Sequence, residues 1–121
     1  MEAFVKRYTE ISGEFIDVEG KVKGVTKRVV IGPEQQAPNF YMRVFTLNPE
    51  GHSPFHAHDW EHEVFVLRGQ GILVTHKETR LEHPLTPGDV ALVPPGILHQ
   101  FLNRSSQEEF EFICIVPSHG E

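Results

Sequence analysis

Three histidines, His56, His58 and His62, lie within seven residues near the middle of the chain, and they constrain the fold more than any other feature. If residues 56–58 are extended, the two-residue period of a strand places His56 and His58 on one face. Trp60 and Glu61 would then form a turn, and His62 would begin the next strand, facing the first pair. Imidazole is the commonest metal ligand, so the cluster predicts a metal site. The alternative is a set of solvated surface histidines.

Composition limits the classes of protein and partner. The chain has 121 residues, enough for one domain with its own core. Its net charge of −6 argues against nucleic acid or an anionic membrane as a partner. The single cysteine, Cys114, excludes an internal disulfide and suits a reducing compartment. The N-terminal residues lack the apolar core of a signal peptide, and no apolar run is long enough to span a membrane. We therefore expect a cytoplasmic protein.

Short apolar segments separated by Gly and Pro indicate the fold class. Alternating or apolar runs occupy residues 15–18, 22–31, 40–47, 64–67, 72–76, 80–85, 90–93, 99–103 and 110–116. Turns are expected at 48–51 and 86–89, and a hairpin loop at 77–79. No stretch has a convincing helical period. Many short strands at a spacing of roughly ten residues predict an all-β sandwich or barrel with little or no helix.

Two stretches carry a family resemblance. The first reads Gly51, four residues, His56-x-His58, three residues, His62, six residues, Gly69. The second reads Gly88, five residues, Pro94-x-Gly96, two residues, His99, three residues, Asn103. Together they resemble the two motifs of the cupin superfamily. The resemblance implies a double-stranded β-helix (a jelly-roll β-barrel) formed by residues 1–121 as a single domain, with N-terminal strands in 1–47 and metal-binding motifs at 51–69 and 88–103.

The position where most cupins carry a glutamate ligand is His62, and the first glycine spacing is one residue shorter than usual. The segments 37–40, 58–63 and 112–117 further resemble small, single-domain, four-histidine manganese cupins. The resemblance implies one divalent metal ion held by His56, His58, His62 and His99. Manganese is the first candidate, and Fe, Ni, Co, Cu and Zn also suit four neutral nitrogen donors.

The donor set has chemical consequences. Four imidazoles on one side of an octahedron would leave two adjacent positions for substrate or oxygen, whereas a closed tetrahedral zinc site would be structural. Without an anionic ligand the ion keeps its full +2 charge. That charge favours anion binding and makes Lewis-acid or peroxide-level chemistry easier than one-electron donation to dioxygen.

Strand parity indicates which other residues face the histidines. Five residues share the inward parity of the histidines and are expected to line a cavity or to form barrel core: Val64, Val66, Phe101, Phe112 and Cys114. Arg43 could bind a substrate carboxylate, but a salt bridge at an edge or a dimer interface is favoured. Asp59, Glu61 and Glu63 could orient imidazoles, although Glu61 and Glu63 point away from His62 by parity. The four remaining histidines are expected at the surface: His52, His76, His83 and His119.

Two classes of function remain. The first is a metal-dependent, dioxygenase-like oxidoreductase acting on a small, largely apolar molecule; the resemblance extends to enzymes that cleave alkene double bonds oxidatively. The second is a non-catalytic module that binds a metal or a small molecule. A Lewis-acid isomerase or lyase is a third option. A second apolar face, formed by Phe65, Leu67, Ile113 and Ile115, predicts a homodimer or coverage by the N-terminal strands.

Overall fold

The alternating segments form nine strands in residues 2–120, the part of the chain that the computed structural model describes. The strands are β1 (Glu14–Val18), β2 (Val22–Ile31), β3 (Phe40–His52), β4 (His62–Arg68), β5 (Gly71–His76), β6 (Arg80–Leu85), β7 (Val90–Val93), β8 (Leu98–Leu102) and β9 (Phe110–Pro117). The helical elements of these residues are three single turns of 3-10 helix, η1 (Tyr8–Glu10), η2 (Pro33–Gln35) and η3 (Ser118–Gly120). The all-β prediction is confirmed. Residues 1 and 121, the ends of the predicted domain, lie outside the described residues.

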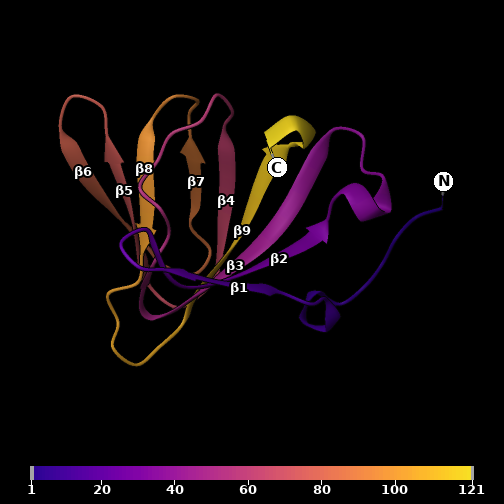
Figure 1. Cartoon of the computed structure of the whole chain (residues 1–121), viewed down its shortest axis with the longest axis horizontal. Helices are drawn as coiled ribbons and strands as arrows, with labels where there is room; N and C mark the ends of the chain where they lie inside the picture. The colour runs from indigo at the N-terminus through magenta and orange to yellow at the C-terminus, as the bar shows by residue number, and fades with distance from the viewer. Residues whose placement is uncertain (1, 121) are drawn as a thin grey trace.

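One curled sheet contains every strand. Its hydrogen-bonded order is β6-β5-β8-β3-β9-β4-β7, and β2 also pairs with β3 and carries β1. The strands open like a fan from β6 and β5 at one end to β2 at the other (Figure 1). Residues 40–47 of β3 pair antiparallel with β9, whereas His52 at its other end pairs with Leu102 of β8. β3 therefore links the two halves of the barrel.

The predicted turn at residues 48–51 is wrong, because β3 continues to His52. Val25 pairs with Leu47 and Lys23 with His52, so the extra residues of β3 bulge out of the ladder. The buried Asn103 stabilises this bulge, because its side-chain amide donates to the carbonyl oxygens of Leu47 and Asn48, each at 3.1 Å. Residues 48–51 are of turn-forming types, but strand pairing with β2 resumes after them, at His52.

The core lies on the concave side of the sheet. β4 alternates between buried and exposed residues, with His62, Val64 and Val66 facing inward. Phe112 of β9 is 2% exposed, and its ring lies 4.5 Å from Phe101 and 5.6 Å from Phe45, between centroids. Among the described residues, no helix is long and apolar enough to cross a membrane.

Candidate metal centre

Backbone hydrogen bonds position the histidine loop. The prediction of a strand at residues 56–58 is wrong: His56 forms only an isolated bridge with His99, and residues 57–61 form no strand. The His56 N–H donates to the His99 carbonyl at 3.1 Å, and the His99 N–H donates back at 2.9 Å. Gly96 N–H donates to the His58 carbonyl at 2.7 Å. These backbone hydrogen bonds hold the histidine loop against β8 and the residues just before it, although the loop forms no continuous strand pairing with β8.

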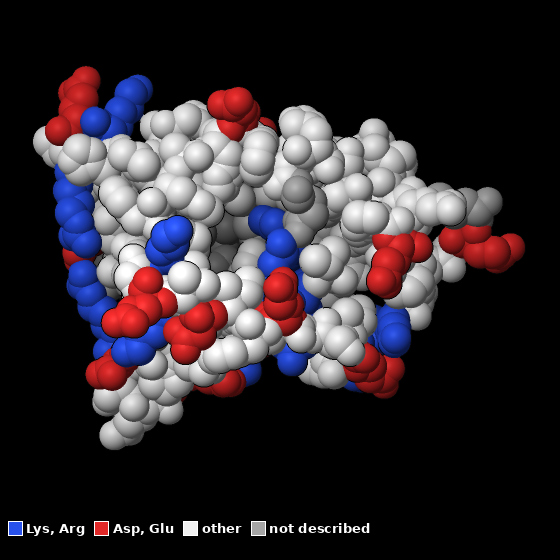
Figure 2. Space-filling view, in the orientation of Figure 1, with Lys and Arg blue, Asp and Glu red and all other residues white. Residues whose placement is uncertain are grey.

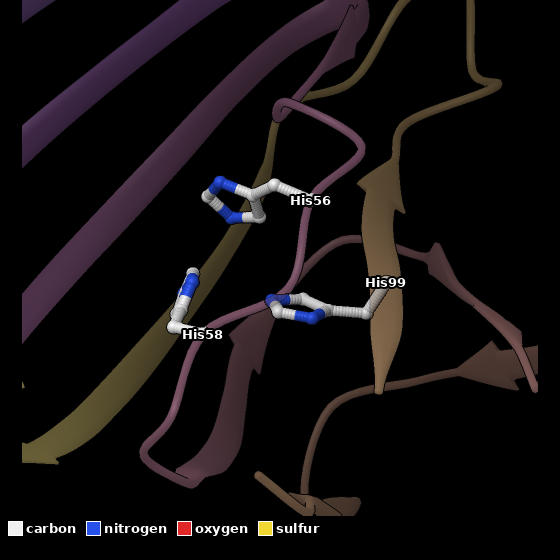
Figure 3. A group of neighbouring side chains, drawn as sticks. All are labelled: His56, His58 and His99. Atoms are coloured by element: carbon white, nitrogen blue, oxygen red, sulfur yellow. The ribbon is translucent and has the colours of Figure 1, made fainter. Parts of the chain in front are cut away.

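Four imidazole rings converge where this loop meets β4 and β8. Ligand nitrogens of His56, His58 and His99 all lie within 4.8 Å of one another, and the three rings face a common space (Figure 3). His62, the first residue of β4, joins them: its Nε2 lies 2.8 Å from Nε2 of His58, and its ring centroid lies 5.0 Å from that of His99. The structure thus brings together all four histidines of the predicted ligand set.

A hydrogen bond on the far side of the His99 ring selects the tautomer that a metal site needs. Nδ1 of His99 lies 2.9 Å from the carbonyl oxygen of Ile97, so it carries the proton and leaves Nε2 as a lone-pair donor. Nδ1 of His62 lies 3.1 Å from Sγ of Cys114 and 3.5 Å from Nη2 of Arg43, and its Nε2 faces His58. Two nitrogens at 2.8 Å must share a proton or a cation, so the donor set fits a divalent metal ion.

Electrostatics keep the rings neutral. Burial lowers the pKa of His62 to about 3, and the nearby His99 and Arg43 add to the effect. Burial and the neighbouring His99 and His58 lower the pKa of His56 to about 4, although the residue as a whole retains exposed surface. Burial also lowers the pKa values of His58 and His99. Because protons compete with metal ions for imidazole, these shifts favour metal binding at neutral pH.

The four histidines line a cavity of about 460 Å³. Of the five residues predicted by parity, Phe101, Phe112 and Cys114 line it. Val64 and Val66 are buried at 4% and 1% exposure but belong to the core beside it. Trp60 also lines the cavity, with its ring 4.7 Å from that of His58.

Arg43 lies inside the protein, at a position that was not favoured from the sequence. The favoured position at an edge or a dimer interface is wrong, because Arg43 lies in a central strand, is 5% exposed and lines the cavity. Its Nε donates to the carbonyl oxygen of Cys114 at 3.3 Å, and its Nη2 donates to the Cys114 sulfur at 3.2 Å. The signal was present in the sequence, since Arg43 shares the parity of Phe45 and Leu47, which line the same cavity.

The other candidates lie away from the centre. Glu61 and Glu63 are exposed and line a separate surface hollow, which agrees with their parity. Asp59 lies near enough to His58 to raise its pKa, against the larger lowering by burial. The remaining histidines, His52, His76, His83 and His119, do not belong to the cluster. His76, His83 and His119 are exposed, and His52 is half-buried beside Gln100.

Comparisons with known proteins identify the family. Residues 43–116 match the family model described as a cupin domain. The chain is 31% identical over 75 residues to 1-methylthio-D-xylulose 5-phosphate methylsulfurylase of Rhodospirillum rubrum, covering 62% of this chain and 46% of that protein. It is 33% identical over 89 residues to L-ectoine synthase of Mycolicibacterium gilvum, covering 74% and 65%. The matched segments thus span less than two thirds of either relative.

The structure agrees with this assignment. The polyketide cyclase RemF from Streptomyces resistomycificus superposes with a TM-score of 0.85 at 30% identity, over 98% of this chain and 80% of that one. The curled β architecture, the two motifs and the histidine cluster that lines the cavity all match the predicted double-stranded β-helix. The chain therefore belongs to the cupin superfamily.

Proposed function

We propose that this protein is a metal-dependent enzyme that acts on a small, largely apolar molecule. In this proposal His56, His58, His62 and His99 hold one divalent transition metal ion, with manganese as the first candidate. The observation that carries it is the convergence of four neutral imidazoles at an apolar cavity of about 460 Å³. Clefts of a few hundred Å³ with apolar walls and a few polar groups are typical of small-molecule sites.

In this proposal different residues around the cavity have different roles. The imidazoles supply only neutral donors, so none of the four offsets the charge of the ion. Phe101, Phe112 and Leu47 form apolar walls that would exclude water and orient the substrate. Cys114 and Arg43 contact Nδ1 of His62, at 3.1 Å and 3.5 Å, and would help to hold the orientation of that ring. When bound, a divalent ion here would act as a Lewis acid toward an oxygen atom of the substrate or of an oxidant.

The first candidate reaction is oxygenase-like. The resemblance to four-histidine manganese cupins supports it, because those relatives include enzymes that cleave alkenes oxidatively. The neutral donor set also supports the oxygenase-like reaction, since a divalent ion held by four neutral imidazoles would keep its +2 charge and attract an anionic oxidant.

The second candidate is a reaction without net oxidation, such as an isomerisation, an elimination or a cyclisation. The names of similar proteins favour it: RemF is called a polyketide cyclase, and two sequence relatives are called a synthase and a methylsulfurylase. An enolate formed during such a reaction is an anion, which the same charge would stabilise.

One pair of assays separates the candidates. Metal-loaded protein is incubated with a styrene-like alkene and either dioxygen or peroxide, and carbonyl products are measured. In parallel, an aryl ketone is incubated anaerobically in D₂O, and hydrogen exchange beside its carbonyl is followed by NMR. Products only with an oxidant support the oxygenase, and exchange without oxygen supports the second candidate. Neither activity, with the metal bound, would indicate a binding module.

The variant His62→Glu tests whether the charge of the donor set controls the reaction. Glutamate restores the anionic ligand common in cupins, so the variant should still bind a metal ion while reacting at a different rate. An unchanged rate would mean that the charge of the donor set does not control the reaction.

A further inference from the structure

Trp60 separates the metal cavity from a second space at the surface. Its side chain lines the cavity of about 460 Å³ and also a surface hollow of about 580 Å³, and no other described residue lines both. The turn η3 follows the same division, because Gly120 lines the cavity whereas His119 lines the hollow. Trp60 and η3 therefore form the partition between the two spaces.

The two parts of this partition are in close contact. A Cβ added at Gly120 would lie 2.7 Å from Cδ1 of Trp60 and 2.8 Å from both Cγ and Nε1, so no side chain fits between them. Hydrogen bonds hold the turn to which Gly120 belongs: the Ser118 N–H donates to the Asn39 carbonyl at 3.0 Å, and Ser118 Oγ donates to the Pro38 carbonyl at 3.3 Å. The turn therefore supports the indole.

Hydrogen bonding does not explain why this position holds a tryptophan. The Nε1 atom of Trp60 is buried and has no hydrogen-bond partner among the described residues. A buried donor without a partner lowers stability, and a purely apolar ring would avoid that cost. The large area of the indole, which closes the partition, gives a physical reason for the residue.

The indole lies at the metal end of the cavity, because its ring centroid is 4.7 Å from that of His58. The cavity reaches solvent elsewhere: His56 lines it and is exposed, and the face drawn in Figure 2 is hollowed near its centre. A ligand can therefore enter without moving the partition. Trp60 is an end wall of the cavity and not its entrance.

We propose that Trp60, supported by Gly120, sets the length of the molecules that the metal cavity accepts. The inference rests on the proposed function, because it narrows the substrate class of the same site. A ligand that enters beside His56 and reaches the indole ends next to His58, so the group that it presents to the metal ligands is terminal or nearly so. Longer molecules would have to cross the partition into the hollow.

A series of neutral phenylalkanols, from 2-phenylethanol to 8-phenyloctanol, measures that length. Binding to metal-free protein in chelator is followed by calorimetry. Each methylene that becomes buried should tighten binding roughly fourfold, and the affinity should reach a plateau at the chain length that meets the wall. Trp60→Ala joins the cavity to the hollow, so the plateau should move to longer chains. 8-Phenyloctanol should then bind at least about tenfold more tightly than it binds to the wild type.

Phe40→Ala is the matched control. Phe40 is 66% exposed and lines the hollow but not the cavity, so its loss should leave the plateau at the chain length of the wild type. Thermal melts establish that each variant folds.

The possible outcomes are distinct. A plateau at the same chain length in the wild type and Trp60→Ala would overturn the inference, as would an equal shift in Phe40→Ala. A wild type that shows no plateau, or no binding of any alcohol to either protein, would also overturn it.

A second variant decides if Trp60→Ala does not fold. Trp60→Phe keeps an apolar ring and removes the unpaired N–H, so it should fold, but it shortens the wall by one ring of the indole. An affinity for 8-phenyloctanol raised about threefold or more supports the inference, and an unchanged one overturns it. Since chelator is present throughout, a protein that proves never to bind metal would contradict the proposed function and not this result.

Discussion

The metal-free protein should lose stability as the pH falls from 8 to 5, and His62 should account for a large part of the loss. Its pKa is lowered from 6.5 to about 3, chiefly by burial. At pH 5 the unfolded chain binds a proton on this ring while the folded chain does not, so acid favours unfolding. The resulting loss in the free energy of unfolding amounts to about 2 kcal/mol at pH 5 and vanishes near pH 8. The side chain is well shielded from solvent, because His62 is only 7% exposed.

The assay is urea unfolding in chelator at pH 8, 7, 6 and 5. A loss of about 2 kcal/mol corresponds to a fall of about 1 M in the urea midpoint for a domain of this size. The other three cluster histidines have lowered pKa values and act in the same direction. Carboxyl groups titrate mainly below this window, so they contribute little to the change between pH 8 and pH 5.

Two variants isolate His62. His62→Asn removes its titration, so the pH dependence between 8 and 5 should become shallower by about 2 kcal/mol, whatever the variant costs at pH 8. His76→Asn alters an exposed histidine of β5 and should leave the slope unchanged. A slope that is the same in wild type and His62→Asn would refute the reasoning, because it would mean that the folded chain protonates this ring as readily as the unfolded one does.

Two further predictions concern the scaffold. Gly69 has a φ of +77°, and an added Cβ would overlap the carbonyl oxygen of Glu109, so in urea titrations Gly69→Ala should lower the free energy of unfolding by more than the roughly 1–2 kcal/mol that backbone strain alone costs. Gly88→Ala is the control: its φ is +91° but no atom lies within 4 Å of the new Cβ, so its loss should be about 1 kcal/mol; equal losses would contradict the steric argument. We also predict a homodimer through the outer face of β4 and β7, where Val90 and Leu92 are 73% and 61% exposed; sedimentation should give twice 13.8 kDa, and Val90→Asp should give a monomer. A wild-type monomer at high micromolar concentration would exclude this dimer.

Most of the strands could be predicted because burial imposes a two-residue period on them. Residues 22–31 and 90–93 form strands with the predicted boundaries. The failure at residues 48–51 arose because turn-forming residues also suit a bulge, and the side chain that stabilises the bulge, Asn103, is 52 residues further along. Such distant contacts leave no local pattern.

The four histidines were predicted to meet, but the backbone that brings them together differs in part from the prediction. Parity on a strand was expected to align His56 with His58, but a backbone bridge to His99 positions the loop instead. His62 does begin a strand, as predicted, and faces the cluster. The buried position of Arg43 was not favoured because arginine is usually exposed, although strand parity placed it inside.

Metal analysis of protein purified without a histidine tag tests the central claim most directly. The wild type should contain close to one transition metal ion per chain. Alanine at any of the four cluster positions, His56, His58, His62 or His99, should lower that content, because each removes one donor from the same centre. His76→Ala and His83→Ala, which alter exposed histidines, should keep it. A wild type that stays metal-free when supplied with Mn, Fe, Ni or Zn, or an equal loss in His76→Ala, would contradict the four-histidine centre.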